Sequence, residues 1–178
     1  PDQLNFGRKI IDMSRSELSY SIIDQIESLE MISNSYGKEL NHIKAHGALY
    51  NQMINDSDLA NFYLDTIKGY KKKYSLYVPF QSEIEKLAIN KGFDIIYEVF
   101  GDRNYNNDLS LVSRDQKDAI INDPDDVIEH LKTIIDTNTI KTINGNFKKI
   151  KFDTICIHSD TNNSIEILKK INKVFKNR

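Results

Sequence analysis

The alternation of short apolar runs with helical patterns is the feature that most constrains how this chain can fold. Apolar runs occur at residues 40–45, 76–79, 95–100 and 154–158. Segments with helical periodicity follow at residues 58–73, 82–90, 124–136 and 164–175. Strands that alternate with helices at this spacing are typical of parallel sheets with right-handed crossovers. The sequence therefore predicts an α/β fold, and a length of 178 residues favours a single domain over residues 1–178.

Local signals indicate where two of the helices begin. Ser14 followed by Glu17 is a capping-box pattern, so we expect a long amphipathic helix from there to Gly37. The apolar residues that recur at helical spacing along it are Leu18, Ile22, Ile26, Leu29 and Ile32. Asp123 followed by Pro124 predicts the start of another helix, because aspartate caps helices well and proline suits the first helical position.

Composition excludes several classes of partner. The net charge is −2 with acidic and basic residues interspersed, so the chain has no strong field for nucleic acid or an anionic membrane surface. No apolar run approaches the roughly 20 residues that cross a bilayer. Cys156 is the only cysteine, which rules out an intramolecular disulfide. We therefore expect a cytoplasmic protein with a small-molecule or protein partner.

The densest group of chemically active side chains lies at the end of the first apolar run. In an extended segment His42, Lys44 and His46 share one face, and Gly47 allows a sharp exit. This is typical of a binding loop at the carboxyl end of a parallel strand. His46 is a candidate general base or metal ligand, or else a neutral histidine that caps the strand. Lys44 binds either a substrate carboxylate or an ion-pair partner inside the sheet, and His42 is expected to serve structure.

Further polar candidates follow this strand and the later ones. They are Tyr50 and Asn51 beyond the first strand, Asp102 and Arg103 after the third, Arg114 in the next loop, and His158 with Asp160 after the last. Asp102 could handle a proton while Arg103 clamps an acid group, or the two could pair as a loop staple. Asp160 could hold the imidazole of His158 in one tautomer. His130 is expected at the surface, and Cys156 in the core.

Five ordered motifs carry a resemblance to a known family. Residues 44–51 read K-A-H-G-A-L-Y-N, residues 99–103 V-F-G-D-R, residues 111–114 L-V-S-R, residues 156–161 C-I-H-S-D-T, and residues 1–8 P-D-Q-L-N-F-G-R. The sequence resembles the LamB/YcsF family in these segments. Ala45 and Ser113 stand where the family has proline, which removes rigidity but no functional group. Ser159 stands where the family has a glycine that lets the backbone approach a ligand closely.

The resemblance implies a fold. Members of the family form a distorted seven-stranded (β/α) barrel of the glycoside hydrolase/deacetylase type. Their motifs D-L-N-x-D-x-G-E, C-G-F-H-A-G-D and G-A-H-P come before P-D-x-x-N-F-G-R and do not occur in this sequence. We therefore expect an N-terminally truncated barrel domain that lacks its N-terminal strands. The sheet edges left open would need a partner chain or a rearrangement to cover them.

The resemblance also implies an activity. The family includes the A-subunit of ATP-dependent 5-oxoprolinase, which with partner subunits B and C cleaves 5-oxoproline to L-glutamate as ATP is hydrolysed. By this resemblance the catalytic residues are His46, Lys44 and Asp102. Substrate binding falls to Arg103, Arg114, Tyr50, Asn51, His158 and Asp160.

The cofactors and the alternatives follow from the same resemblance. ATP with Mg²⁺ is the expected cosubstrate of the complex, and a divalent metal in this chain is an open alternative. The sequence has no Gly-rich phosphate loop of the Walker type, so ATP is expected on another chain of the complex or at a shared interface. The alternative activities are a metal-dependent, deacetylase-like hydrolase of carbohydrate or amide substrates, and an inactive truncated remnant.

Overall fold

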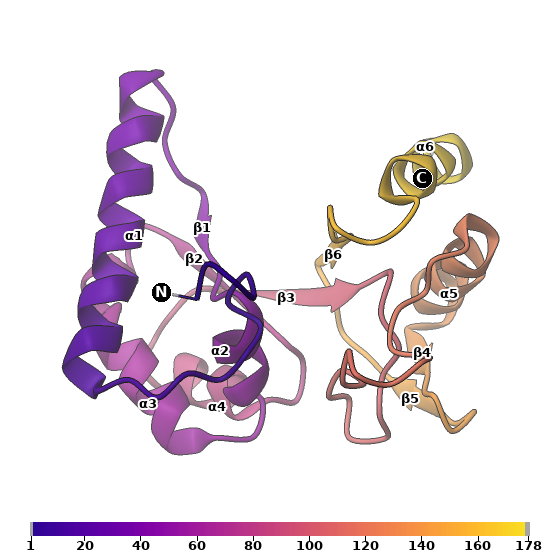
Figure 1. Ribbon diagram of the computed structural model, residues 1–178, viewed down its shortest axis with the longest axis horizontal. Helices are drawn as coiled ribbons and strands as arrows, with labels where there is room; N and C mark the ends of the chain where they lie inside the picture. Colours follow the sequence, from indigo (N-terminus) through magenta and orange to yellow (C-terminus); the bar gives the residue numbers. More distant parts are fainter. Residues whose placement is uncertain (1, 177–178) are drawn as a thin grey trace. The chain divides into compact units, whose positions relative to one another are not determined.

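The computed structural model describes residues 2–176, and the chain divides into two compact units, Pro1–Ile96 and Tyr97–Arg178 (Figure 1). The first unit contains α1 (Arg15–Ser35), β1 (His42–Ile43), α2 (Gly47–Gln52), α3 (Ser57–Thr66), the 3-10 helix η1 (Lys68–Tyr70), β2 (Ser75–Val78) and α4 (Glu83–Asn90). β3 (Ile95–Phe100) begins in the first unit and continues into the second. The second unit also contains α5 (Pro124–Thr137), β4 (Thr139–Lys141), β5 (Phe147–Lys149), β6 (Thr154–Cys156) and α6 (Ser164–Phe175).

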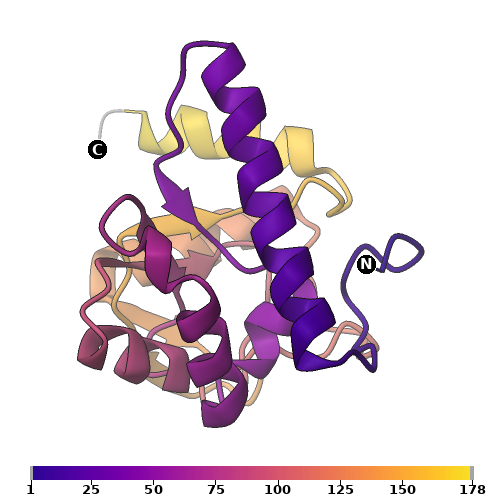
Figure 2. The same cartoon turned by 90° about the vertical axis from the view of Figure 1, so that its left-hand side faces the viewer.

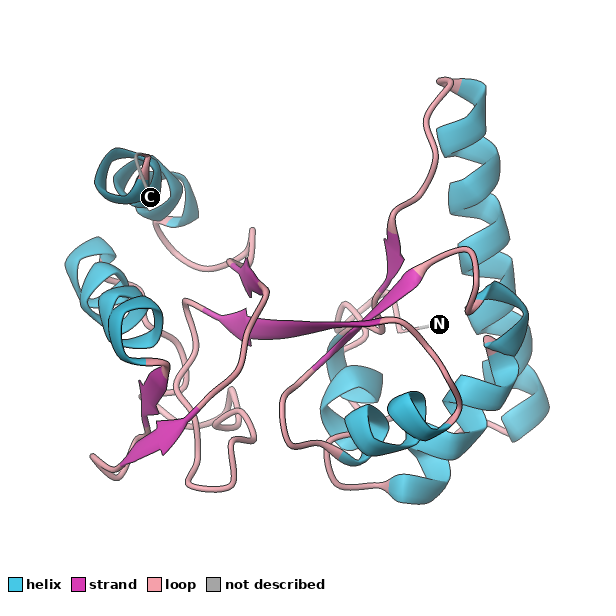
Figure 3. Cartoon of the chain, turned by 180° about the vertical axis from the view of Figure 1, so that it is seen from behind, coloured by secondary structure: helices cyan, strands magenta, loops and turns pink. Residues whose placement is uncertain are grey.

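Each unit contains a parallel strand pair. In the first unit β1 pairs with β2, and His42 lies opposite Ser75. In the second unit β3 pairs with β6, and Phe100 lies opposite Cys156, while β4 and β5 form a separate antiparallel hairpin (Figure 3). Helices lie between the paired strands in the chain, as parallel connections require. The α/β class with parallel strands is confirmed, and the seven-stranded barrel and the truncation stay predictions.

The capping signals in the sequence place the helix starts correctly. The Ser14 hydroxyl accepts a hydrogen bond from the Glu17 N–H at 3.2 Å, and the Glu17 carboxylate accepts one from the Ser14 N–H at 2.9 Å. This reciprocal pair satisfies two of the donors that a helix start leaves open. The Asp123 carboxylate accepts a bond from the Asp125 N–H at 2.7 Å, with Pro124 at the first position of α5.

The long helix α1 is much more exposed than its apolar pattern predicts. Ile22 is buried, but Leu29 and Ile32 are 54% and 56% exposed. Figures 1 and 2 show the C-terminal half of α1 extending beyond α3 and α4 of the same unit. The predicted long helix is confirmed, but the part of its apolar face in that half is not covered by the unit.

Several element boundaries also differ from the sequence-based expectations. The first strand is expected over residues 40–45, but only His42–Ile43 pair as β1. The helix expected over residues 58–73 ends at Thr66, and the 3-10 turn η1 follows. The strand expected to be buried over residues 154–158 is the half-exposed β6, Cys156 included. The short helix α2 is not predicted, because its N-cap residue His46 makes no side-chain capping bond and provides no start signal.

Each unit buries an apolar core of its own. The largest fully buried side chains of the first unit are Met53, Tyr63, Leu64, Ile67, Leu76 and Val78. Those of the second unit are Val99, Val112, Leu131, Ile134, Ile140 and Ile167. Large apolar side chains of this kind contribute roughly 1.5–3 kcal/mol each when fully buried. Ile43 of β1 and Val99 of β3 are buried, and both lie on strands whose ends carry candidate site residues.

Candidate functional site

The first cluster of candidate residues lies where β1 leads into α2. Ile43 and Ala45 are buried, whereas Lys44 is half-buried and His46 is exposed. This confirms the alternation predicted for the segment, with the apolar residues on one face and the chemically active ones on the other. The Lys44 ammonium lies 5.7 Å from the centre of the Tyr50 ring, a cation–π distance. Lys44 and Tyr50 are therefore brought together at this strand end.

An N-terminal turn, residues 2–8, contacts the imidazole of His46. The Nε2 atom of His46 lies 2.9 Å from the Phe6 carbonyl oxygen, and the Phe6 ring meets the imidazole edge-on at 4.8 Å between ring centres. The Gly7 carbonyl accepts a hydrogen bond from the Ala48 N–H at 2.9 Å. Since the imidazole is engaged by backbone and ring, the contacts favour a role for His46 in holding this turn. They do not test its predicted catalytic role.

Glycine is required at the point where the turn meets α2. Gly47 has a φ of +61°, and a Cβ atom built on it would lie 2.2 Å from the Gly7 carbonyl oxygen. A side chain would therefore meet both backbone strain and a direct clash. The sharp exit that the sequence predicts at Gly47 is confirmed.

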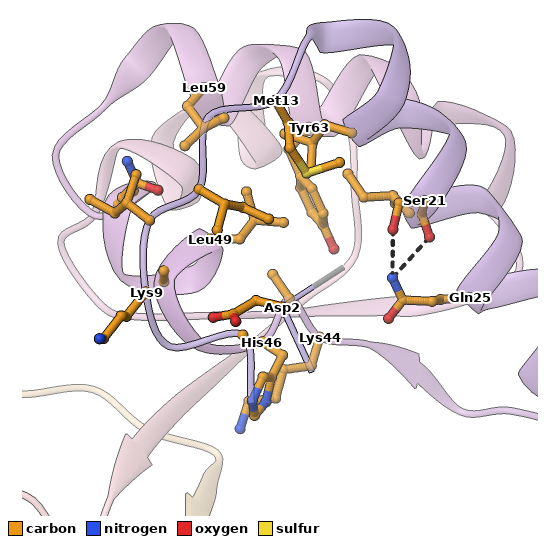
Figure 4. Close-up of a pocket in the computed structure, with 18 of the residues that line it drawn as sticks. Asp2, Lys9, Met13, Ser21, Gln25, Lys44, His46, Leu49, Leu59 and Tyr63 are labelled. Carbon is orange, nitrogen blue, oxygen red and sulfur yellow. Dashed lines mark hydrogen bonds between the residues drawn. The ribbon is translucent and has the colours of Figure 1, made fainter. Parts of the chain in front are cut away.

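A cavity of about 740 Å³ opens between this turn and helices α1 to α3 (Figure 4). Its apolar wall includes Met13, Leu18, Ile22, Leu49 and Leu59. Polar groups reach it from Asp2, Lys9, Lys44 and His46. The Tyr63 ring projects into the cavity in Figure 4, and burial raises the pKa of its phenol far above the ordinary value. The cavity therefore joins cationic side chains to an apolar surface, an arrangement that suits a small organic acid.

The second cluster lies at the carboxyl ends of β3 and β6. Because Phe100 pairs with Cys156, the residues two positions further along each strand, Asp102 and His158, come face to face. The Asp102 carboxylate is fully buried, and its Oδ1 atom lies 2.9 Å from Nδ1 of His158. The Phe100 ring stacks on the imidazole at 5.1 Å between ring centres, with the planes 8° apart. The carboxylate that holds His158 is thus Asp102, not Asp160 as the sequence suggested.

Two more donors fix the Asp102 carboxylate. Its Oδ2 atom accepts a hydrogen bond from the His158 N–H at 2.9 Å and another from the Thr161 hydroxyl at 2.5 Å. Burial alone would raise the pKa of Asp102, but the hydrogen bonds from His158 and Thr161 outweigh it and lower the pKa below the ordinary value. Asp102 is therefore an ionised carboxylate that orients an imidazole.

Arg103, the neighbour of Asp102, holds the loop that follows β3. It is 3% exposed, its Nε donates to the Ala119 carbonyl at 3.1 Å, and its Nη2 donates to the Val112 carbonyl at 2.6 Å. These contacts favour a structural role for Arg103 in this loop over the predicted clamp on a substrate acid. The sequence suggested Asp102 as the partner of such a staple, whereas these partners are backbone carbonyls, which residue types alone cannot reveal.

Arg114 and Asp160 form a more exposed pair in the second unit. Nη1 of Arg114 lies 3.7 Å from Oδ2 of Asp160, and the two side chains are 24% and 39% exposed. An ion pair of this length and exposure contributes little to stability. The Arg114 guanidinium can still bind a ligand carboxylate or phosphate. Asn51, another predicted binding residue, is exposed on α2 of the first unit.

His130 is not the surface residue that the sequence suggested. It lies on α5, is half-buried, and places its Nε2 atom 3.4 Å from the Phe100 carbonyl. Burial lowers its pKa, although the Phe100 carbonyl and the charge of Asp102 act in the opposite direction. A neutral His130 therefore packs behind the strand end that carries Asp102.

The described residues 2–176 gather no group of three or more His, Cys, Asp or Glu side chains that could hold a metal ion. In the same part of the chain, no helix combines the length and the apolar character needed to cross a membrane.

Comparison with known proteins decides the family. The model of the LamB/YcsF family matches residues 1–178. The chain belongs to the LamB/YcsF family. This LamB/YcsF chain is 35% identical over 176 residues to a 5-oxoprolinase A-subunit from Pyrococcus horikoshii, covering 99% of the chain and 69% of that protein. It is also 35% identical over 167 residues to a 5-oxoprolinase A-subunit from Acinetobacter baumannii, covering 94% of the chain and 66% of that protein.

A solved structure supports the fold. The LamB/YcsF chain matches the crystal structure of a lactam utilization protein from Thermus thermophilus with a TM-score of 0.84 and 24% sequence identity. The match covers 98% of this chain and 71% of that one. At this identity the likeness shows the fold alone. The resemblance indicated by the motifs is confirmed at the level of the family.

Thr161 is a residue of this cluster that the sequence-based prediction did not include. It closes the C-I-H-S-D-T motif and is 4% exposed, with its hydroxyl on Asp102. The motif contains the signal, but a neutral hydroxyl is a weaker indication of chemistry than the ionisable residues beside it. The role of Thr161, three residues after His158, can be recognised only once Asp102 is known to contact both residues.

Proposed function

We propose that this chain acts as the A-subunit of an ATP-dependent 5-oxoprolinase and, with partner subunits B and C, opens 5-oxoproline to L-glutamate as ATP is hydrolysed in the cytoplasm. The observation that carries the proposal is the buried Asp102 carboxylate on Nδ1 of His158. Opening a lactam requires water, and this pair provides an oriented base for it. The names of the Pyrococcus and Acinetobacter relatives suggest the substrate and the reaction.

The chemistry of the lactam explains the need for ATP. A five-membered lactam is a stable amide, and transfer of the γ-phosphoryl group to its oxygen, with ADP leaving, makes the ring carbon electrophilic. Water attacks this carbon while Nε2 of His158 takes its proton. The imidazolium returns that proton to the ring nitrogen as the C–N bond breaks, which gives γ-glutamyl phosphate. A second water releases phosphate and leaves glutamate. Asp102 keeps the proton of the imidazole on Nδ1, so that Nε2 is the basic atom.

Cations of this chain balance the charge of the substrate and of the phosphoryl group. In the second unit Arg114 lies in the loop that follows β3 and pairs with Asp160, two residues after His158. Its guanidinium can bind the carboxylate of 5-oxoproline. In the first unit Lys44 reaches the cavity and can bind an anionic group there. His46 then holds the N-terminal turn through the Phe6 carbonyl, which leaves proton transfer to His158.

The residues present do not favour a resident metal centre. Because the described chain gathers no set of three metal-binding side chains, no step is assigned to such a metal. Mg²⁺ that arrives with ATP supplies neutralisation of the phosphate charge.

Reconstitution tests the proposal. The chain combined with subunits B and C should form glutamate and ADP in equal amounts when 5-oxoproline and ATP are both supplied, and neither product when one is left out. Metal-dependent turnover of an acetylated sugar or amide without ATP would indicate the deacetylase-like alternative. A folded complex that performs neither reaction would indicate an inactive remnant.

A further inference from the structure

The Thr161 hydroxyl is directed at a buried carboxylate, which side-chain packing alone does not explain. Its side chain is 4% exposed, and its hydroxyl lies 2.5 Å from Oδ2 of a fully buried carboxylate, Asp102. An ionised carboxylate only accepts hydrogen bonds, so the single hydroxyl proton of Thr161 must point at Asp102. Charge-assisted bonds of this kind are about twice as strong as bonds between neutral groups.

Oδ2 of Asp102 accepts more hydrogen bonds than Oδ1. Oδ2 of Asp102 receives the Thr161 hydroxyl and the His158 N–H, both of which come from the segment after β6. These two donors set the plane of the carboxylate. Nδ1 of His158 then lies 2.9 Å from Oδ1 and 3.1 Å from Oδ2, so the imidazole meets both oxygens of the carboxylate. Without the hydroxyl, the carboxylate keeps one backbone donor and gains freedom to rotate away from the imidazole.

Thr161 is also tied to His158 through the backbone. The Thr161 N–H donates to the His158 carbonyl at 3.3 Å, and the Ser164 N–H donates to the Thr161 carbonyl at 3.1 Å at the start of α6. The turn after β6 thus fixes the position of the Thr161 hydroxyl relative to the His158 imidazole, although the two groups interact only through Asp102. A residue placed in this way acts on His158 through a third group.

We propose that Thr161 is a positioning residue, which holds the Asp102 carboxylate so that His158 keeps its proton on Nδ1 and presents Nε2 as the base. The role in turnover rests on the function proposed above, whereas the role in fixing the tautomer does not. The charge of Asp102 acts on His130 of α5. It also acts on the buried Tyr105 phenol, together with the charges of Glu98 and Arg103.

The test reads the tautomer of His158 directly by nitrogen NMR in the full chain. Thr161→Val removes the donor with little change of shape, Thr161→Ser retains it, and Thr142→Val is the matched control, because Thr142 is 3% exposed and donates to Asn107 at 2.9 Å elsewhere in the second unit. We expect the Nδ1–H tautomer in the wild type, Thr161→Ser and Thr142→Val, and a mixture of tautomers in Thr161→Val. A His158 spectrum unchanged in Thr161→Val overturns the proposal.

Two further measurements, hydroxyl proton exchange and the kinetics of the reconstituted complex, separate the positioning role from a failure to fold and from the proposed function. In the wild-type chain the Thr161 hydroxyl proton should exchange slowly with water, and fast exchange overturns the proposal even if Thr161→Val fails to fold. In the reconstituted complex kcat should fall roughly 10-fold in Thr161→Val with KM within about 2-fold, and Thr161→Ser should restore it. A tautomer change in a complex without 5-oxoproline-dependent ATP hydrolysis supports the positioning role and rejects the proposed function.

Discussion

Oδ1 of Asp102 lies 2.9 Å from Nδ1 of His158, although 56 positions separate the two residues in the sequence. The parallel pairing of β3 with β6 creates this contact, because it aligns Phe100 with Cys156 and so brings together the residues that follow them. Parallel strands commonly bring functional residues together at their carboxyl ends. The Asp102–His158 pair is therefore a direct product of strand order.

Replacing Asp102 should change the acid sensitivity of the fold. The pKa of Asp102 is lowered in the folded chain, so its contribution to stability is present above the unfolded value of 3.8 and is lost as the pH falls through the lower folded value. Asp102→Asn should cost about 1–3 kcal/mol at pH 7, because its amide group opposes the donors around it. Urea unfolding measures the difference in free energy of unfolding between the wild type and Asp102→Asn, which should be smaller at pH 3 than at pH 7. An equal difference at both pH values would mean that Asp102 is not the titrating group.

Gly47→Ala should destabilise the first unit more than Gly37→Ala. Both glycines have positive φ, +61° and +64°, but a Cβ at Gly47 meets the Gly7 carbonyl at 2.2 Å, whereas a Cβ at Gly37 meets nothing within 4 Å. The backbone strain alone costs about 1–2 kcal/mol, and the clash should bring Gly47→Ala to about 3 kcal/mol or more. Denaturant unfolding of the two variants measures the difference. Equal losses would show that the N-terminal turn does not pack on Gly47 as described.

Arg103→Lys should lower stability and leave substrate affinity nearly unchanged. Lysine keeps the charge but lacks the planar fork that reaches the Ala119 and Val112 carbonyls together, so a loss of about 1–3 kcal/mol is expected. Arg114→Lys is the matched control. Because the ion pair of Arg114 is long and partly exposed, this change should lower the free energy of unfolding by no more than about 0.5 kcal/mol. If Arg103→Lys instead unfolds like the wild type and raises KM for 5-oxoproline, Arg103 is the substrate clamp that the sequence suggested.

Local features of this fold were predictable, and non-local ones were not. The capping pattern at Ser14 and Glu17 and the Asp123-Pro124 start depend on neighbours a few residues apart, and both hold in the structure. The exposure of Leu29 and Ile32 depends on how far α1 extends beyond its neighbours, which periodicity cannot reveal. Apolar spacing indicates a face but not what covers it.

The same distinction explains the candidate site. Asp102 and His158 can each be predicted from the sequence because each follows a strand, but residue types do not reveal that β3 and β6 are neighbours. The sequence therefore favoured Asp160, two residues away, as the partner of His158. The hydrogen-bond partners of Arg103 could not be predicted from the sequence for a similar reason, because they are backbone carbonyls, which carry no side-chain signature.

The most direct test of the proposed mechanism is the rate of 5-oxoproline-dependent ATP hydrolysis by the reconstituted complex with His158→Gln. Loss of an oriented general base should lower kcat by roughly 10²- to 10⁴-fold. His42→Gln is the control, since His42 is an exposed histidine that stacks on Tyr77 at 3.8 Å between ring centres, and it should keep the wild-type rate. A His158→Gln complex that turns over at the wild-type rate, with the variant folded, would contradict the role assigned to the Asp102–His158 pair.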